Sequence, residues 1–238
     1  MTWSDFDAVL FDLDGVLTPT AEVHRRAWAQ LFTDFLAQRG DATPYTEADY
    51  YDHIDGRPRY EGVRTFLASR DIMLPEGTPA DHPSEQTVCG LGNRKNDFFN
   101  EVLRTEGIDA FPGSVRLLDA LADTDVAVAV VSSSRNARAV LTAAGLIDRF
   151  EVIIDGEVAD AEGIAGKPEP DTFVVAAERV GAAVDRCVVV EDAVSGVRAG
   201  RAGNFGLVVG VDRGAGQQAL TEAGADRVVD DLDRLIEL

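Results

Sequence analysis

The chain has 238 residues, 45% of them hydrophobic, which is enough for a full core together with a smaller inserted or appended unit. Its formal net charge of −20 argues against nucleic acid or an anionic membrane as partner, because both require clustered Lys and Arg. No apolar run approaches the roughly 20 residues that span a bilayer, and the first residues carry acids where a signal peptide is basic, so we expect a soluble, cytoplasmic protein.

Short apolar runs rich in Val and Ile alternate with amphipathic stretches along the chain. The runs lie at residues 8–11, 126–131, 152–154, 187–190 and 207–209. Their hydrophobicity is continuous, which is typical of strands covered on both faces. Helical patterns lie at residues 114–122, 135–145, 171–181 and 194–203, and most end in glycine. This alternation predicts an α/β fold with a Rossmann-like, doubly wound parallel sheet.

The interval from residue 20 to residue 106 breaks this rhythm. It has three helical patterns, EVHRRAWAQLFTDFLAQRG, RYEGVRTFLASRD and NDFFNEVLRTEG, and no apolar strand run. We therefore expect an all-helical cap domain at residues 19–106, inserted after the first strand, and a core domain made of residues 1–18 and 107–238. Residues 75–87 are rich in Pro and acids, which predicts a surface loop within the insertion.

An acidic pair, Asp12 and Asp14, follows the first strand in the run FDLDG. Two carboxylates spaced i, i+2 on a buried strand point the same way and repel each other unless a divalent cation or a proton relieves them. Gly15 permits the tight turn that brings Asp14 round the same centre as Asp12. Directly after AVLF, this pattern is much more specific than a DxD in any acidic chain.

Three further polar segments follow later strands, at the edge where parallel sheets place their sites. The run after residues 126–131 leads into a helix, so its hydroxyl and amide groups either bind an anion or cap the helix. This run comprises Ser132, Ser133, Ser134, Arg135 and Asn136. Glu191 and Asp192 end a fourth strand and suit the oxygen-rich ligand shell of Mg²⁺.

Lys167 lies between a glycine and a proline, and the chain has only one other lysine, Lys95, among its 22 basic residues. In a chain so poor in lysine, these two mark positions that need a compact ammonium rather than a planar guanidinium. The alternative for Lys167 is a solvated loop lysine. Together with the acids and hydroxyls, it supplies the nucleophile, proton-transfer group, metal site and cation that phosphoryl transfer through a carboxylate requires.

This motif set resembles the haloacid dehalogenase superfamily, and the whole chain is similar to its β-phosphoglucomutase-like subfamily. The resemblance implies that Asp12 is phosphorylated, that Asp14 shuttles the proton, and that Ser132 and Lys167 hold the transferring phosphoryl group. It also implies a Mg²⁺ ion bound by Asp12, the Asp14 carbonyl and Asp192, with Glu191 nearby. A helical cap inserted after the first motif is a further property of this subfamily.

The resemblance extends into the expected cap. The run TAEVHRRAW, from Thr20 to Trp28, is similar to a mutase stretch in which the histidine, here His24, supports the acid/base aspartate and the hinge. The alternative for His24 is an ordinary histidine on a helix face. The run RKND is similar to the sugar-contacting segment of the mutases and gives Lys95 a role in substrate binding.

The resemblance also implies a second phosphate site. The run Gly56-Arg57-Pro58-Arg59 resembles the cap loop whose arginine holds the phosphate that is not transferred. Arg59 has the matching spacing, and Arg57 is a nearby substitute. On the core side, this site would be completed by Ser134, Arg135 and Asn136.

The chain departs from the subfamily pattern at four places, and these leave the identity of the sugar open. Arg135 replaces a lysine, which keeps the charge and changes the geometry. Pro19 stands where an acid is common, Ala193 replaces a serine, and the loop at residues 75–87 is longer than expected.

The leading hypothesis is therefore a magnesium-dependent, β-phosphoglucomutase-type isomerase of hexose phosphates, and the alternative is a sugar-phosphate phosphatase with the same aspartyl-phosphate. Hydrolysis of carbon–halogen bonds is disfavoured, because relatives that perform it lack the second aspartate and the metal. A non-catalytic binding module is disfavoured because no element of the set is missing. Dinucleotide oxidoreduction is excluded by DGVL in place of G-x-G-x-x-G. We expect a monomer that acts on a small phosphorylated sugar, with no nucleic-acid or membrane partner.

Overall fold

The computed structural model describes residues 2–54 and 57–237, which form two compact units. Unit 1 comprises Met1–Thr20 and Ile108–Leu238, and unit 2 comprises Ala21–Gly107. The sequence placed the corresponding boundaries at residues 18 and 106, and the assignment of the two segments as a core domain and a cap domain stays a prediction.

Unit 1 is built on a six-stranded sheet with the strand order β3-β2-β1-β4-β5-β6. All of its neighbouring strands are parallel, and the central strand β1 pairs with β2 and β4. The strands are β1 (Ala8–Phe11), β2 (Ala127–Val131), β3 (Val152–Ile154), β4 (Cys187–Glu191), β5 (Leu207–Val211) and β6 (Arg227–Val229). The predicted doubly wound α/β fold is confirmed; the sixth strand, β6, is an edge strand that the sequence analysis missed.

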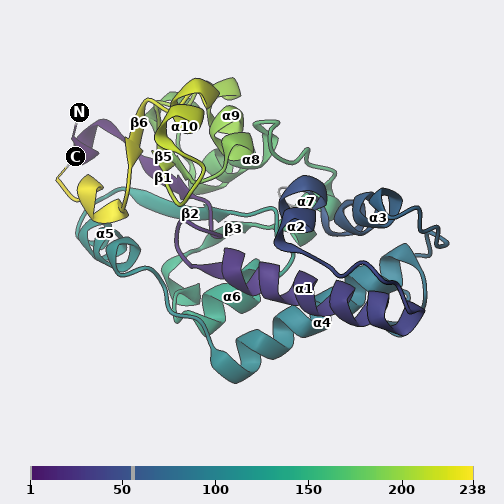
Figure 1. Cartoon of the computed structure of the whole chain (residues 1–238). Helices are drawn as coiled ribbons and strands as arrows, with labels where there is room; N and C mark the ends of the chain where they lie inside the picture. Colours follow the sequence, from purple (N-terminus) through teal and green to yellow (C-terminus); the bar gives the residue numbers. More distant parts are fainter. Residues whose placement is uncertain (1, 55–56, 238) are drawn as a thin grey trace. The chain divides into compact units, whose positions relative to one another are not determined.

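Helices cover both faces of this sheet (Figure 1). Along β1, Ala8 and Leu10 point into a core that includes Phe173, Val197 and Leu220 from α8, α9 and α10. The alternate residues of β1 face the side of α5 and α6. The helices of unit 1 are α5 (Pro112–Ala122), α6 (Ala137–Ala143), α7 (Gly156–Glu162), α8 (Asp171–Val180), α9 (Val194–Ala202) and α10 (Gln217–Ala223). Short 3₁₀ turns add η1 (Trp3–Asp5), η2 (Ile147–Arg149), η3 (Val184–Arg186) and η4 (Leu232–Leu235).

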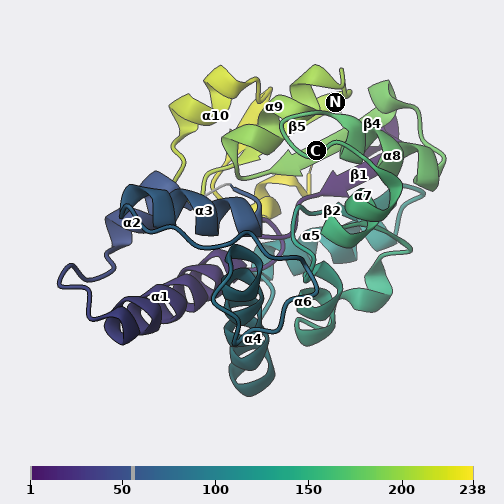
Figure 2. The ribbon, with the colours of Figure 1, turned by 90° about the vertical axis from the view of Figure 1, so that its right-hand side faces the viewer.

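Unit 2 contains helices and no strand among its described residues. An aromatic core joins them, in which the ring centroids of Phe32 and Phe66 are 3.7 Å apart and Trp28 stacks on Phe32. Gly92 lets α3 and α4 approach closely, because a Cβ atom there would lie 2.6 Å from the Tyr60 ring. The helices are α1 (Thr20–Arg39, whose first residue belongs to unit 1), α2 (Glu47–His53), α3 (Arg59–Ser69) and α4 (Val88–Glu106), and Figure 2 shows α1 beside α4.

Residues 75–87 form a loop without helix or strand, and most of them are exposed. Side chains of α4 hold this loop in place. The Asn93 amide donates hydrogen bonds to the carbonyls of Pro79 and Asp81, and Arg94 donates one to the carbonyl of Pro83. In the described ranges, no helix has the length and apolar character needed to cross a membrane.

Each unit contains one of the two tryptophans of the chain, Trp3 and Trp28, so fluorescence can follow the two units separately. We expect Phe173→Ala to lower the free energy of unfolding of unit 1 by about 3–5 kcal/mol, because the ring is fully buried against the sheet and its loss leaves a cavity. Urea unfolding, followed through Trp3 in a Trp28→Phe background, measures this loss.

The matched control is Glu178→Ala, an exposed position on the same helix, which should change the free energy by about 0.5 kcal/mol or less. Equal effects of the two substitutions would contradict the assignment of α8 to the core of unit 1.

Candidate active site

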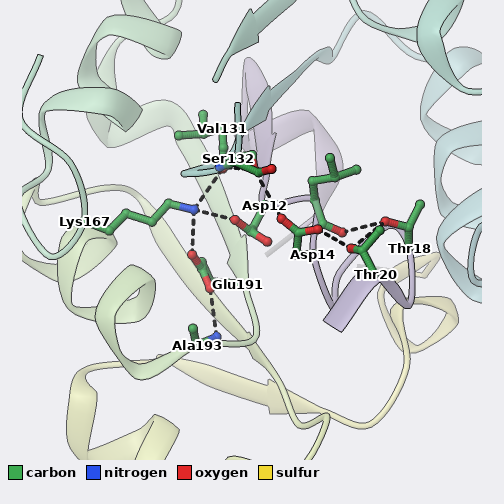
Figure 3. Close-up of polar contacts among 11 residues, drawn as sticks. Asp12, Asp14, Thr18, Thr20, Val131, Ser132, Lys167, Glu191 and Ala193 are labelled. Carbon is green, nitrogen blue, oxygen red and sulfur yellow. Dashed lines mark hydrogen bonds and ion pairs between the residues drawn. The ribbon is translucent and has the colours of Figure 1, made fainter. Parts of the chain in front are cut away.

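The predicted site residues of unit 1 converge where β1, β2 and β4 end. Asp12 directly follows β1, Ser132 follows β2, and Glu191 is the last residue of β4. Because these strands are neighbours in a parallel sheet, their carboxyl ends bring the three side chains to one edge. Lys167 reaches the same place from the connection between α7 and α8 (Figure 3).

Lys167 is the centre of a buried ion-pair network (Figure 3). Its Nζ atom donates hydrogen bonds to Asp12 Oδ1 at 2.5 Å and to the Val131 carbonyl at 2.8 Å, and it lies 2.8 Å from Glu191 Oε1. The side chain is 6% exposed, so Lys167 is not a solvated loop lysine. All three N–H donors of the ammonium therefore have an acceptor.

The electrostatics of the network are dominated by burial and by an excess of negative charge. Burial raises the pKa of Asp12 well above its usual range, and Glu191, Asp14 and Asp192 raise it further, although Lys167 opposes them. Burial and the charges of Glu191 and Asp14 raise the pKa of Asp192 to about 8. Burial alone would lower the pKa of Lys167, but attraction to Asp12 and Glu191 outweighs it and raises that pKa. The ammonium therefore stays charged, and the carboxylates need further positive charge or protons.

Three carboxylates of this edge fit a divalent cation. Asp12, Glu191 and Asp192 each offer an oxygen, and the three oxygens lie within 4.8 Å of one another. Carboxylate oxygens are the ligands that hard cations such as Mg²⁺ prefer. The Asp14 carboxylate does not belong to this cluster. The family resemblance implies that Asp14 binds Mg²⁺ through its backbone carbonyl instead.

Asp14 is positioned by a tight turn that follows β1. The amides of Leu17 and Thr18 both donate to the carbonyl of Leu13, and the amide of Gly15 donates to the carbonyl of Thr18 at 2.8 Å. Gly15 has φ +90°, and a Cβ atom there would lie 2.0 Å from Asp192 Oδ2, so this position requires glycine.

The turn aims the Asp14 carboxylate at two hydroxyls. It accepts a hydrogen bond from Thr20 Oγ1 and a longer one, at 3.4 Å, from Ser132 Oγ (Figure 3). Asp14 is half-buried, whereas Asp12 is only 7% exposed. Two carboxylates in different surroundings are the arrangement that separates a nucleophile from a proton carrier.

The serine run after β2 forms two successive hydroxyl–amide turns. Ser132 Oγ accepts from the Ser134 amide at 3.0 Å, and Ser134 Oγ accepts from the Asn136 amide at 3.1 Å. Ser132 and Asn136 are buried, whereas Ser133 is exposed. Arg135 forms an ion pair with Asp160 of α7, a partner that the sequence analysis did not foresee.

The predicted residues of unit 2 form a cationic group of their own. Lys95 is 3% exposed, and its Nζ atom lies 2.5 Å from His24 Nδ1. An ammonium only donates, so His24 accepts as a neutral imidazole, and its ring stacks on Phe99. Burial lowers the pKa of His24, and the charges of Lys95 and Arg59 lower it further.

The two predicted cap arginines have different surroundings. Arg59 is half-buried and donates to Asn96 Oδ1 at 2.8 Å. Arg57 is exposed and pairs with Glu61 at 3.2 Å. Gly56, the third residue predicted in this run, lies outside the described residues.

The sequence analysis missed two residues, Gly196 and Arg213, that lie against the backbone or side chains of the site. Gly196 lies in the first turn of α9, and a Cβ atom there would lie 1.6 Å from Glu191 Oε1. Arg213 follows β5 and donates a hydrogen bond from Nε to the carbonyl of Gly15 at 3.1 Å. The signal for Arg213 was present, because it lies just after a predicted strand, the same rule that identified the other segments.

Comparisons with known proteins agree on one family. The sequence model of haloacid dehalogenase-like hydrolases matches residues 6–204. The β-phosphoglucomutase of Mycobacterium tuberculosis is 50% identical over 96% of this chain and 91% of that protein. Hexitol phosphatase A of Escherichia coli is 32% identical over 95% of this chain and 91% of that protein.

A solved structure is similar to this chain over nearly its whole length. A mutant of CbbY from Rhodobacter sphaeroides, in complex with xylulose-(1,5)bisphosphate, superposes with a TM-score of 0.75 at 25% identity. The superposition covers 97% of this chain and 96% of that one.

We expect Gly196→Ala to weaken Mg²⁺ binding about 10- to 100-fold, because the added methyl group displaces Glu191 from its contacts with Lys167 and with the amide of Ala193. Calorimetric titration of the folded variant with Mg²⁺ measures the loss. Gly62→Ala is the matched control, since a Cβ atom at this helical glycine meets only ordinary contacts of 3.4 Å or more. Unchanged Mg²⁺ affinity in folded Gly196→Ala would remove Glu191 from the cation site.

Proposed function

The chain belongs to the haloacid dehalogenase-like hydrolase family and to its β-phosphoglucomutase-like group, and on this premise we propose that it interconverts a hexose 1-phosphate and a hexose 6-phosphate. The reaction passes through a phosphoryl group carried on Asp12. The observation that carries this proposal is the Asp12 carboxylate, held between the Lys167 ammonium and the acidic cluster at the end of the sheet. The 50% identity to a β-phosphoglucomutase over nearly the whole chain supports the choice of reaction.

The first half-reaction loads Asp12. A carboxylate oxygen of Asp12 attacks phosphorus, the bond between phosphorus and the sugar oxygen breaks, and Asp14 gives a proton to the departing oxygen. The sugar that leaves Asp12 loaded is a bisphosphate, and it departs as a monophosphate. In the second half-reaction, the free hydroxyl of a hexose monophosphate gives its proton to Asp14 and takes the phosphoryl group, which restores the bisphosphate and the Asp12 carboxylate. Asp14 thus returns to its starting protonation state after each cycle.

The surrounding groups lower the electrostatic cost of these steps. Lys167 holds one oxygen of Asp12 and keeps positive charge beside the phosphoryl oxygens, and the Ser132 hydroxyl is a donor at the same edge. Asp12, Glu191 and Asp192 would hold Mg²⁺, which supplies charge that offsets the carboxylates when a phosphate approaches.

A mutase also needs to hold the phosphate that is not transferred. We assign this role to Arg59 in unit 2 and to Ser134, Arg135 and Asn136 in unit 1, with Lys95 and His24 binding the sugar. The structure of CbbY with a sugar bisphosphate supports a substrate with two phosphates in this family. The 32% identity to hexitol phosphatase A supports the alternative, in which water takes the phosphoryl group from Asp12.

The mutase assignment predicts isomerisation rather than phosphate release. Incubation with β-glucose 1-phosphate, Mg²⁺ and a trace of the 1,6-bisphosphate should yield glucose 6-phosphate, because the bisphosphate loads Asp12 and the loaded enzyme then phosphorylates the substrate. A coupled dehydrogenase assay reads the product, and a phosphate assay runs in parallel.

Asp12→Asn is the control for this experiment, since an amide does not attack phosphorus, and both readouts should fall to background. Release of inorganic phosphate without any glucose 6-phosphate would overturn the mutase assignment and favour the phosphatase.

The role of Arg59 predicts a loss that depends on the substrate. Arg59→Ala should raise the KM for the bisphosphate about 10- to 100-fold, because a charge-assisted hydrogen bond to the second phosphate is lost. Turnover of 4-nitrophenyl phosphate, which has one phosphate, should change little. Arg64→Ala is the matched control on the same helix, because Arg64 forms an exposed ion pair with Glu76. Equal losses on both substrates would argue against a second phosphate site at Arg59.

A further inference from the structure

Arg213 joins four parts of unit 1 that are far apart in sequence. Its Nε atom donates to the Gly15 carbonyl at 3.1 Å, and one terminal nitrogen donates to the Asp230 carbonyl at 3.0 Å. Its guanidinium carbon lies 4.0 Å from the centroid of the Phe111 ring, and its other terminal nitrogen lies 3.6 Å from Asp231 Oδ2. One side chain thus connects the turn after β1, the start of α5, the loop after β5 and the segment after β6.

The hydrogen bond from Arg213 satisfies the carbonyl of Gly15, the backbone group for which the turn provides no donor. The amide of Gly15 is bonded within the turn to the carbonyl of Thr18, whereas its carbonyl takes the Nε hydrogen of Arg213. Gly15 is buried, so loss of this donor would leave a buried carbonyl without its partner. The Gly15 peptide would then turn to find another donor.

Such a movement is transmitted directly to Asp14, which precedes Gly15 in the chain. The side of the turn that faces Asp192 has little room, because a Cβ atom on Gly15 would lie only 2.0 Å from Asp192 Oδ2. A shift of the peptide therefore changes the direction of the Asp14 carboxylate rather than being absorbed locally.

The contacts require the shape of a guanidinium as well as its charge. Arg213 uses Nε on one edge and a terminal nitrogen on another, and its guanidinium carbon lies over the Phe111 ring. A lysine ammonium keeps the charge but has no planar face and no second donor fixed at this angle. Lysine at this position would keep the net charge of the site and lose the geometry.

We propose that Arg213 is a positioning residue for Asp14, which holds the turn after β1 so that the Asp14 carboxylate can transfer the proton to and from the sugar oxygen. This proposal rests on the proposed role of Asp14 in phosphoryl transfer. It does not depend on whether a sugar or water finally takes the phosphoryl group, because both reactions share the first transfer to Asp12.

The test compares two leaving groups in single-turnover measurements of phosphoryl transfer to Asp12. A sugar oxygen departs only with a proton from Asp14, whereas 4-nitrophenolate departs as a stable anion. In Arg213→Lys and Arg213→Met, the rate from glucose 1,6-bisphosphate should fall roughly tenfold or more, within the range of a general-acid contribution. The rate from 4-nitrophenyl phosphate should fall about threefold or less, since that step needs little general-acid catalysis.

Arg201→Met is the matched control, because Arg201 is an arginine of unit 1 that pairs with Asp226 on the surface, and this variant should keep both rates. Equal losses on the two substrates would show that Arg213 acts on the whole site and would overturn the proposal, as would wild-type rates on both. Arg213→Lys keeps the positive charge, so it still tests the proposal if Arg213→Met does not fold. If neither variant keeps the cooperative unfolding transition of the wild type, Arg213 is a structural residue and the proposal fails.

Failure of the proposed function is distinguishable from failure of this inference. A wild-type enzyme that releases phosphate from sugar phosphates and forms no isomer would refute the mutase. The same enzyme would still transfer the phosphoryl group to Asp12, so the ratio of the two rates would still test Arg213.

Discussion

Four carboxylates meet where β1 and β4 end, and the other features of the site offset their mutual repulsion. The register of the sheet makes this crowding unavoidable: Phe11 pairs with Val190, so the residues that follow them, Asp12 and Glu191, are neighbours. Burying charges this close together is costly unless they are paired. Lys167 pairs with two of the acids at once and leaves a negative excess, which a divalent cation can balance. The same charges that repel a phosphate could therefore hold the cation that would offset this repulsion.

The acids keep their geometry because the backbone around them has no room to move. Glu191 fills the space where Gly196 would carry a Cβ atom, and Asp192 fills the corresponding space at Gly15. Glu191 and Asp192 can lie where they do only because Gly196 and Gly15 have no side chain; a Cβ atom at either glycine would overlap the carboxylate. A site built in this way depends on rigid turns, and a rigid turn needs partners for its backbone groups. Arg213 meets this requirement at Gly15, because it donates a hydrogen bond to the carbonyl of that residue.

The parts of the fold that continuous apolar runs encode could be predicted, and the parts that depend on loop paths could not. The strands that carry Asp12, Ser132 and Glu191 were expected at nearly their observed positions, because burial on both faces leaves an unbroken run of apolar residues. β6 was missed, since RVV is short and begins with the exposed Arg227. The helix expected from residue 135 begins at Ala137, because the serine turns use the preceding residues. The pairing of Arg135 with Asp160 needs α7, a short helix without a clear apolar pattern. The catalytic and binding roles stay predictions.

The scarcity of lysine in this chain explains why its two lysines could be recognised as candidate site residues from the sequence. Of the 22 lysines and arginines, all but Lys95 and Lys167 are arginines, and most of the arginines in ion pairs lie at the surface, where a planar guanidinium is easily accommodated. Both lysines are buried instead. Lys167 fits between two carboxylates and a carbonyl, and Lys95 lies beside His24 with its Nζ atom 4.9 Å from the Phe99 ring centroid. The three acceptors around the Lys167 Nζ atom suit the three donors of a compact ammonium, whereas a planar guanidinium holds its donors in a different, fixed arrangement. The bias toward arginine elsewhere thus isolates the two positions at which the geometry of the cation, and not only its charge, is constrained.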